Sequence, residues 1–340
     1  MATPWQGAKP TPERIFNTLT AFQQTEALKA AIELDIFTKI GEGASDVSTL
    51  AKRVGAADRG VRILCDFLTI HGFLTKDQGH YALTQESAIF LDRRSPACVG
   101  SMSDFLASER SKSTFALLKD AVRKGGTTTN TGDHLQPNDE MWVTFAKSMS
   151  VLTGMSAAFI AQLIGAAEKK PCKVLDIAAS HGMFGITIAK QNPNAQIVAL
   201  DWPAVLDVGK QNAQAAGVGG RYTALLGSAF ETDFGTDYDY VLVTNLLHSF
   251  DPQTCGILLR KIYAALKPSG KAITLEFVPN EDRVSPPTAA GFSLIMLANT
   301  DEGDAYTFAE HDKMFREAGF AKTTLYQVPD SPQQVLVSEK

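Results

Sequence analysis

The sequence predicts an α/β protein whose second half is built on a mostly parallel sheet and whose first half is mainly helical. From Lys173 onward, short apolar stretches that suit buried strands alternate with segments of helical periodicity. Before that point, apolar residues recur at helical spacing. The pattern changes near residues 165–172, and a chain of 340 residues is expected to hold about two domains.

The composition is that of an ordinary globular protein, with 44% hydrophobic and 20% charged residues, which excludes disorder and fibre. The formal charge of −5 gives no electrostatic reason to expect nucleic acid as a partner. No long apolar run or signal peptide is apparent, so we expect no membrane and a cytoplasmic location. Four widely separated cysteines form no zinc or disulfide pattern and are expected to be reduced: Cys65, Cys98, Cys172 and Cys255.

One long helix or two should open the chain, because Phe16, Leu19 and Phe22 recur at helical spacing and an apolar stripe continues to Ile32. This helix has more apolar surface than one small domain can bury, which predicts a homodimer interface.

Two shorter helices follow. Asp46 is expected to cap the first, which stops at Gly55, and Asp58 to cap the second, which ends at Gly72.

A β-hairpin comes next, with strands at 73–75 and 80–83 around a polar loop. Helix, helix and hairpin in this order predict a winged helix, a fold that often binds DNA. Residues 23–94 contain nine Lys/Arg and ten Asp/Glu, so a DNA-binding surface is disfavoured and a packing or dimerisation role is favoured.

We expect three parts: a winged-helix dimerisation domain over 1–98, a helical connector over 99–170 that contributes to the acceptor pocket, and an α/β domain over 171–340. The connector includes a glycine- and threonine-rich surface loop, 125–132, which could flex.

The α/β half is predicted element by element. Strands are expected at 174–177, 197–200, 221–226, 240–244, 271–277, 323–326 and 334–338. Helices are expected at 184–189, 204–215, 254–266 and 308–318.

Ligands of such sheets bind beyond the carboxyl ends of the strands. The loop after the first strand runs from Asp176 through small residues to Gly182, which permits close approach of a ligand but is not a dinucleotide fingerprint. Asp201 ends the second strand, and its carboxylate could accept both ribose hydroxyls of an adenosine. These two features indicate an adenosine-containing ligand without choosing among such ligands.

The order and spacing of six short motifs resemble those of class I S-adenosylmethionine-dependent methyltransferases. They are Val174-Leu175-Asp176 with Gly182, Leu200-Asp201-Trp202-Pro203, Gly227-Ser228-Ala229-Phe230, Leu246-Leu247-His248, Leu266-Lys267-Pro268-Ser269-Gly270-Lys271 and Glu317-Ala318-Gly319-Phe320. With the helical front half, nearly the whole chain resembles the caffeic-acid and acetylserotonin type of O-methyltransferase. The resemblance implies a Rossmann-like class I methyltransferase domain, S-adenosylmethionine as cofactor, and a small-molecule methyl acceptor.

The resemblance also implies roles for individual residues. Cofactor binding falls on Asp176, Ala178, Ser180, Gly182, Asp201, Trp202, Ser228, Ala229, Phe230 and Thr244. Ser228 and Thr244 stand where the family pattern has Asp and Lys, and Trp202 falls where an apolar residue packs on adenine. His181 either touches the methionine part of the cofactor or caps the following helix.

His248 falls on the general-base histidine of the family, and Glu276 on one of two acids that orient its ring. A hydroxyl attacks a sulfonium methyl far better as it loses its proton, which an imidazole can accept near neutral pH. The second acid falls on Ala305, which cannot orient a ring, so transfer to carbon, sulfur or nitrogen stays open.

Aromatic and methionine side chains suit a flat organic acceptor. The expected acceptor contacts are Phe145, Met149, Met155, Phe292 and Met296, although a plain core explains any of them except Met296 equally well. No spacing of His, Asp and Glu indicates a metal site. Two rival classes remain: a winged-helix regulator that senses the cofactor, and a cofactor-binding protein that does not methylate.

Overall fold

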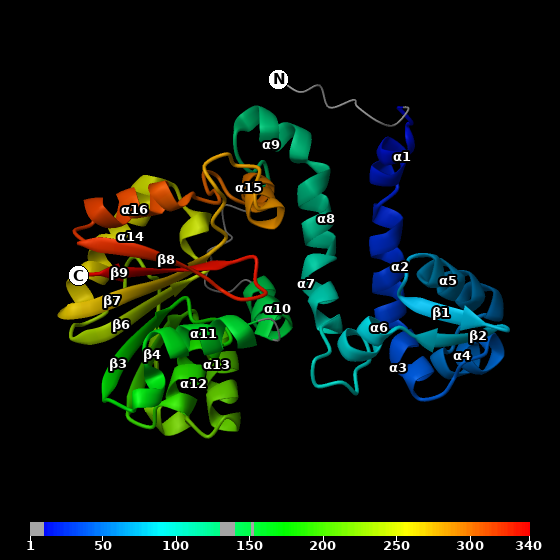
Figure 1. Cartoon of the computed structure of the whole chain (residues 1–340), viewed down its shortest axis with the longest axis horizontal. Coiled ribbons are helices and arrows are strands. Elements are labelled where there is room, and N and C mark those ends of the chain that lie inside the picture. The colour runs from blue at the N-terminus through cyan, green and yellow to red at the C-terminus, as the bar shows by residue number, and fades with distance from the viewer. Residues whose placement is uncertain (1–9, 130–139, 151–152) are drawn as a thin grey trace. The chain divides into compact units, whose positions relative to one another are not determined.

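The computed structural model describes residues 10–129, 140–150 and 153–340. The chain divides into two compact units, Met1–Ser108 and Glu109–Lys340 (Figure 1). The boundary between the units falls inside the predicted connector, whose later residues belong to the second unit.

The first unit is mainly helical, as predicted, with one small hairpin. Its elements are α1 (Glu13–Leu19), α2 (Phe22–Glu33), α3 (Ile36–Gly41), α4 (Val47–Val54), α5 (Asp58–Ile70), β1 (Leu74–Asp77), β2 (His80–Leu83), α6 (Gln85–Phe90) and α7 (Ser103–Leu106). The apolar stripe predicted at the N-terminus is shared by α1 and α2, and Asp35, with a left-handed φ of 60°, separates α2 from α3.

Helix caps in this unit follow the sequence in part. The carboxylate of Asp46 accepts a hydrogen bond from the amide of Thr49 at 2.9 Å, and Gly55 ends α4 with a φ of 66°, as predicted. The prediction that Asp58 caps α5 is wrong, because Ala57 is the capping residue and Asp58 is the first helical residue. An acid in the first turn is still favourable, since it faces the positive end of the helix dipole.

The hairpin is longer than predicted. Gln78 and Gly79 have φ angles of 44° and 85°, which make a two-residue turn that suits the twist of the strands. Lys76 and Asp77 therefore pair with Tyr81 and His80 instead of belonging to the loop.

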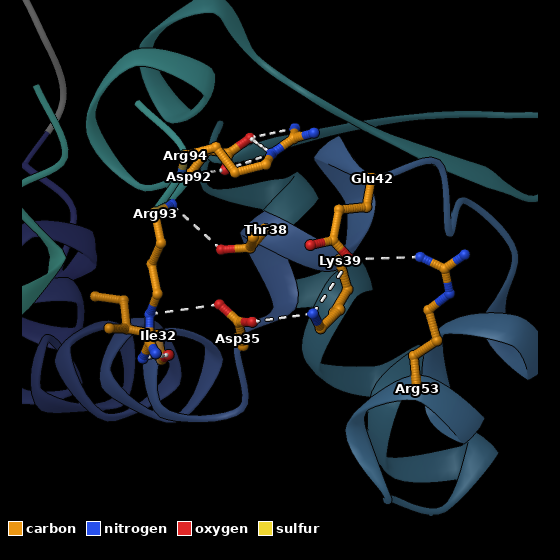
Figure 2. Close-up of polar contacts among 9 residues, drawn as sticks. All are labelled: Ile32, Asp35, Thr38, Lys39, Glu42, Arg53, Asp92, Arg93 and Arg94. Carbon is orange, nitrogen blue, oxygen red and sulfur yellow. Dashed lines mark hydrogen bonds and ion pairs between the residues drawn. The ribbon is translucent and has the colours of Figure 1, made fainter. Parts of the chain in front are cut away.

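A polar network joins the segment after α6 to α3 (Figure 2). The buried carboxylate of Asp92 receives hydrogen bonds from Arg94 Nε at 3.0 Å and Nη2 at 2.6 Å. The neighbouring amide of Arg93 donates to Thr38 Oγ1 at 3.2 Å. The Arg94 guanidinium holds the pKa of Asp92 below its usual value despite burial. Gly41, at the end of α3, leaves the space in which Arg94 and Asp92 meet.

The second unit is built on one sheet of seven strands in the order β5-β4-β3-β6-β7-β9-β8. Its strands are β3 (Cys172–Ile177), β4 (Ala195–Asp201), β5 (Tyr222–Leu226), β6 (Tyr238–Thr244), β7 (Leu266–Glu276), β8 (Lys322–Gln327) and β9 (Gln334–Glu339). The first five run parallel, and β9 pairs antiparallel with both β7 and β8. Every strand predicted in this half is present, and β7 starts earlier than expected.

Nine α-helices of the described residues accompany this sheet. They are α8 (Glu109–Ala116), α9 (Leu118–Lys124), α10 (Glu140–Met149), α11 (Gly154–Leu163), α12 (Met183–Gln191), α13 (Pro203–Ala215), α14 (Pro252–Ala265), α15 (Pro287–Asn299) and α16 (Phe308–Glu317). Figure 1 shows α11, α12 and α13 on one face of the sheet and α14 and α16 on the other.

The two faces have separate apolar cores because successive side chains of a strand point to opposite sides. In β3, Val174 packs in the core that includes α11–α13, whereas Leu175 and Ile177 pack in the core that includes α14 and α16. Because helices cover both faces of this mostly parallel sheet, its central strands need apolar residues at nearly every position.

Three further expectations can be compared with the structure. The four cysteines are free thiols, two of them buried. Among the described residues, no single helix is long and apolar enough to cross a membrane. The predicted flexible loop begins at Gly125, the left-handed C-cap of α9, and its later residues, with His134, lie outside the described part.

Candidate active site

The carboxyl ends of the parallel strands meet at one edge of the sheet, and the central strand β3 pairs there with β4 on one side and with β6 on the other. Such a switch point is the usual ligand site of an open α/β sheet. Asp201 at the end of β4 pairs in register with Leu226 at the end of β5, and Thr244 ends β6. Asp201 and Thr244, both predicted to bind a cofactor, therefore lie at the same edge of the sheet.

The loop after β3 is held in an unusual backbone conformation. Ala178, Ser180 and Gly182 all have positive φ angles, of 54°, 52° and 74°. A Cβ added at Gly182 would lie 2.5 Å from the hydroxyl of Tyr222, so only glycine fits there. Small side chains and left-handed turns keep this backbone open to close approach by a ligand.

Asp201 organises the same loop. Its Oδ2 accepts a hydrogen bond from the amide of Ser180 at 2.8 Å, and its Oδ1 accepts one from the amide of Trp202 at 2.7 Å. Burial raises the pKa of Asp201 to about 6, although both backbone hydrogen bonds oppose that rise. Each carboxylate oxygen can accept a second hydrogen bond, which is what paired hydroxyl donors require.

Asp176 has a different environment. It is fully buried, and its Oδ2 accepts a hydrogen bond from the amide of Gly185 at 3.2 Å within α12. Burial raises its pKa to about 8. The structure therefore places Asp176 beneath the loop, where it supports α12.

His181 caps α12. Its side chain is buried, and Nδ1 accepts a hydrogen bond from the amide of Met183 at 3.1 Å. Burial lowers the pKa of His181 to about 4, so the ring is neutral near pH 7 and able to accept this bond. The sequence left two roles open for His181, contact with the methionine part of the cofactor or support of the following helix. The hydrogen bond to Met183 favours the second.

The loop after β5 contains Ser228, Ala229 and Phe230. The amide of Gly227 donates to the carbonyl of Asp201 at 3.2 Å, which fixes the start of this loop beside the acid. Ser228 Oγ accepts a hydrogen bond from the amide of Phe230 at 3.1 Å, leaving its O–H free to donate.

The polar centre of the site is a pair formed by His248 and Glu276. The ring Nδ1 lies 2.5 Å from Glu276 Oε2, and Glu276 is 1% exposed at the end of β7. The other carboxylate oxygen accepts hydrogen bonds from the amides of Leu246 at 3.0 Å and Leu247 at 2.9 Å. Three donors thus fix the carboxylate, and the carboxylate fixes the ring.

The charge state of this pair follows from its surroundings. Burial alone would raise the pKa of Glu276, but the charge and hydrogen bond of His248, with a smaller effect of His311, hold that pKa below its usual value. An ionised carboxylate binds the protonated Nδ1 and leaves the lone pair on Nε2. The atom available to accept a proton is therefore Nε2.

Aromatic rings flank the histidine. The Phe292 ring meets His248 edge to face, with centroids 4.9 Å apart, and stacks on Phe277 at 4.1 Å. Met296 is buried one turn further along α15. Ala305 is buried, and the adjacent Asp304 instead accepts a hydrogen bond from Arg283 at 3.0 Å. Among the residues that the structure describes, Glu276 is therefore the one acid that is hydrogen-bonded to the ring.

The remaining acceptor candidates lie on other helices. Phe145 and Met149 are half-buried on α10, and Met155 on α11 is 58% exposed. Of the predicted acceptor contacts, Phe292 is the one whose ring meets the histidine within the described part of the chain. Within the described ranges, no group of three His, Cys, Asp or Glu side chains is placed to hold a metal ion.

Two side chains at this edge were not identified from the sequence. His311 on α16 is 1% exposed, and its Nδ1 has no partner among the described residues. Lys261 on α14 donates to three carbonyls of the loop after β5. The sequence held one indication of the role of Lys261: it lies among residues of α14 that are buried, Leu258, Leu259 and Ile262.

Comparison with known proteins gives the family. A model of the O-methyltransferase domain matches residues 116–321, and a model of the O-methyltransferase dimerisation domain matches residues 16–93. The crystal structure of a protein from Nostoc punctiforme, assigned as an O-methyltransferase, superposes with a TM-score of 0.93 at 49% identity, covering 98% of this chain and 100% of that one.

Two further relatives are more distant. PigF, solved with SAH, superposes with a TM-score of 0.86 at 25% identity over 97% of this chain and 100% of that one. The 3-hydroxy-5-methyl-1-naphthoate 3-O-methyltransferase of Streptomyces sahachiroi is 26% identical, covering 91% of this chain and 89% of its own length. The chain belongs to the O-methyltransferase family that combines a dimerisation domain with a Rossmann-like methyltransferase domain.

Proposed function

We propose that this protein transfers a methyl group from S-adenosylmethionine to a hydroxyl of a small aromatic acceptor, with His248 as general base. The observation that carries this proposal is the 2.5 Å contact between His248 and the buried Glu276 at the ligand-binding edge of the sheet. Family membership supports the reaction class, and the contact supports the role of each residue.

The residues at the strand ends fit S-adenosylmethionine. Asp201 can accept both ribose hydroxyls, Gly182 leaves room for the ligand to approach the loop, and the buried Ser180 Oγ has no partner among the described residues. Trp202, Ala229 and Phe230 offer apolar surface for the adenine, while Ser228 and Thr244 offer hydroxyls. When bound, the cofactor supplies an electrophilic methyl group on a sulfonium.

The proton of the acceptor hydroxyl would pass to Nε2 of His248. Glu276 keeps Nδ1 protonated and stabilises the imidazolium that forms, because its carboxylate is already ionised and immobilised by Leu246 and Leu247. The remainder of the catalysis comes from holding the acceptor oxygen in line with the methyl group in a site sheltered from water.

An aromatic acceptor fits the surroundings of the base. Phe292 and Phe277 present stacked rings beside His248, and aromatic rings favour edge or offset contacts with planar ligands. Met296 is buried on the same helix as Phe292, and Phe145, Met149 and Met155 are further candidates for the acceptor pocket.

We also propose that the protein is a homodimer in the cytoplasm, without a nucleic-acid or membrane partner. The dimerisation domain and the exposed apolar residues of α1 support the dimer. In the winged helix, Arg62 and Lys76 both form ion pairs with Asp66, at 2.9 and 2.5 Å, so this carboxylate offsets one of their two positive charges. A regulator that binds DNA would need free cationic side chains for contacts with the phosphates.

The test is incubation with methyl-labelled S-adenosylmethionine and a panel of phenols, with aromatic amines and thiols as alternative acceptors. We expect label to appear on oxygen, located by NMR of the product. Binding of S-adenosylmethionine followed by labelling of only carbon, sulfur or nitrogen would replace the proposed acceptor atom. A protein that binds the cofactor but labels none of the panel would contradict the proposed activity.

Replacing the base tests the mechanism separately. His248→Gln keeps similar size and some hydrogen bonding but removes the titrating nitrogen. Turnover should fall by ~10²–10⁴-fold while the affinity for cofactor stays near wild type. A variant that keeps most of its turnover at pH 7 would exclude His248 as general base.

A further inference from the structure

The ammonium of Lys261 binds three backbone carbonyls of one loop. Its Nζ donates to the oxygen of Ala229 at 3.0 Å, of Phe230 at 2.6 Å and of Thr232 at 3.0 Å. The same atom lies 4.4 Å from the centre of the Phe234 ring. A lysine has three donors, so these carbonyls use its full capacity.

The loop needs a cation at this point. Three carbonyl oxygens that face one centre repel one another through their partial negative charges, and a compact ammonium offsets that repulsion with charge-assisted hydrogen bonds. Burial lowers the pKa of Lys261, while the nearby acids Asp233 and Glu231 act in the opposite direction.

The bound loop starts at the candidate cofactor site. Gly227 donates from its amide to the carbonyl of Asp201 at 3.2 Å, and Ser228 and Thr232 are joined by a backbone hydrogen bond of 2.9 Å. Ser228 Oγ, one of the candidate cofactor-binding groups, accepts a hydrogen bond from the amide of Phe230 within the same turn. The direction of this hydroxyl therefore depends on the conformation of the loop.

The loop also touches the segment that carries the base. The ring of Phe230 packs edge to face on Phe250, with centroids 4.9 Å apart, and Phe250 follows His248 by two residues. A lysine on α14 thus fixes a loop that contacts both parts of the site.

We propose that Lys261 is a positioning residue that holds the loop 227–232 in the conformation that receives the adenosine part of the cofactor. This inference rests on the proposed function. Lys261 acts through the backbone of Ala229, Phe230 and Thr232 and touches no reacting atom.

The experiment compares Lys261→Met with Lys261→Arg, and uses Lys267→Met as matched control. Lys267 follows the same helix but donates to Asp239, at 2.7 Å, near the amino end of β6. Calorimetry measures the Kd of each protein for S-adenosylhomocysteine and for adenosine alone, and kinetics measures KM for cofactor and acceptor.

Lys261→Met should raise the Kd for S-adenosylhomocysteine and for adenosine by the same factor, about tenfold, the scale of a lost charge-assisted contact. The KM for the acceptor should change by less than about twofold, since the carbonyls that Lys261 binds lie on the adenosine side and the loop reaches the segment of the base only through the contact between Phe230 and Phe250. Lys261→Arg should recover most of the affinity, and Lys267→Met should bind like wild type.

The outcomes separate the two proposals. Failure of the wild type to bind S-adenosylhomocysteine would contradict the proposed function itself. Binding by the wild type with an unchanged Kd in folded Lys261→Met would overturn only the role of Lys261. If circular dichroism shows that Lys261→Met is unfolded, the same measurement is made on Lys261→Gln, which also lacks the charge. A Kd for S-adenosylhomocysteine equal to that of the wild type would then overturn the inference.

Discussion

The ring of His248 and the carboxylate of Glu276 lie 2.5 Å apart although 28 residues separate them in the chain. Adjacent parallel strands explain this proximity, because β6 and β7 pair in register with Thr244 opposite Leu275 and both end at the same edge of the sheet. This pairing brings together the residues that follow Thr244 and Leu275. They are His248, on a short turn, and Glu276, at the end of β7.

The pair predicts the effect of Glu276→Gln. An amide can still accept hydrogen bonds from Leu246 and Leu247 through its oxygen, but its NH₂ group would then face Nδ1 and favour the tautomer with the proton on Nε2. Because that tautomer cannot act as base, kcat should fall by ~10²–10⁴-fold with little change in cofactor affinity. Single-turnover kinetics and calorimetry measure the two effects.

A conservative change provides the control. Glu276→Asp keeps the charge but shortens the reach to the ring, so it should lose less activity than Glu276→Gln if charge is the main contribution. Equal turnover by Glu276→Gln and the wild type would show that the carboxylate does not set the tautomer of His248.

Asp201 could be predicted because it ends an apolar strand, and strand ends share one edge of a parallel sheet. His248 lies beyond another such strand, but its role came from the resemblance to the methyltransferase family. The sequence did not predict Lys261, since the partners of this lysine are backbone carbonyls, which leave no pattern in side-chain types. The wrong cap at Asp58 has a similar cause: an acid is favourable at both the cap and the first helical position.

The loop after β3 predicts an unusual stability effect for Ser180. This residue combines a φ of 52° with a buried hydroxyl that has no partner among the described residues. Ser180→Gly removes the strain and the unsatisfied group, and these gains exceed the extra entropy of glycine in the unfolded chain. The free energy of unfolding of the ligand-free protein should rise by about 1 kcal/mol.

Ala179 provides the control for this prediction. It is buried and is not among the residues with positive φ, so Ala179→Gly should lower the free energy of unfolding by about 1–2 kcal/mol. Urea unfolding measures both variants. A loss of stability in Ser180→Gly as large as that in Ala179→Gly would disprove the strain.

Two buried histidines predict acid sensitivity. Burial lowers the pKa of both His181 and His311 to about 4. Between pH 6.5 and 4, the unfolded chain binds protons at these two residues and the folded protein does not, so their contribution to stability is lost as the pH falls through this window. Asp176 and Asp201, whose pKa values burial raises to about 8 and about 6, act in the opposite direction. Each histidine should contribute about 1–2 kcal/mol to the loss between pH 7 and 5.

His311→Phe isolates one of these contributions. The substitution keeps a ring against Tyr306, whose centroid lies 5.9 Å from that of His311, and removes the titrating group. Urea unfolding should show that the free energy of unfolding at pH 5, relative to that at pH 7, is about 1–2 kcal/mol higher in the variant than in the wild type. An unchanged difference would mean that other groups cause the acid sensitivity.

Gly41 should be intolerant of a side chain for lack of space. A Cβ there would overlap both the guanidinium of Arg94 and the carboxylate of Asp92, which are hydrogen-bonded to each other in Figure 2. Gly41→Ala should therefore lower the stability of the first unit by at least about 1 kcal/mol, although alanine is the better helix former. The penalty should be smaller in an Arg94→Ala background, and equal penalties in both backgrounds would contradict the overlap.

The exposed apolar face of α1 makes the dimer testable. Ile15, Phe16 and Leu19 of α1 are 62%, 62% and 67% exposed in the single chain, and Phe22 at the start of α2 is 63% exposed. A second copy would remove this apolar surface from water. The double variant Phe16→Ser/Leu19→Ser should shift the molar mass measured by light scattering from two chains toward one, whereas Asn17→Ser, on the same helix, should not.

Deleting residues 1–22 should expose the apolar surface that this segment covers and lower solubility. Because the base, the acid and the cofactor loops all lie in the second unit, a folded monomeric variant should still bind S-adenosylhomocysteine. A wild-type protein that is monomeric at micromolar concentration would contradict an interface on α1.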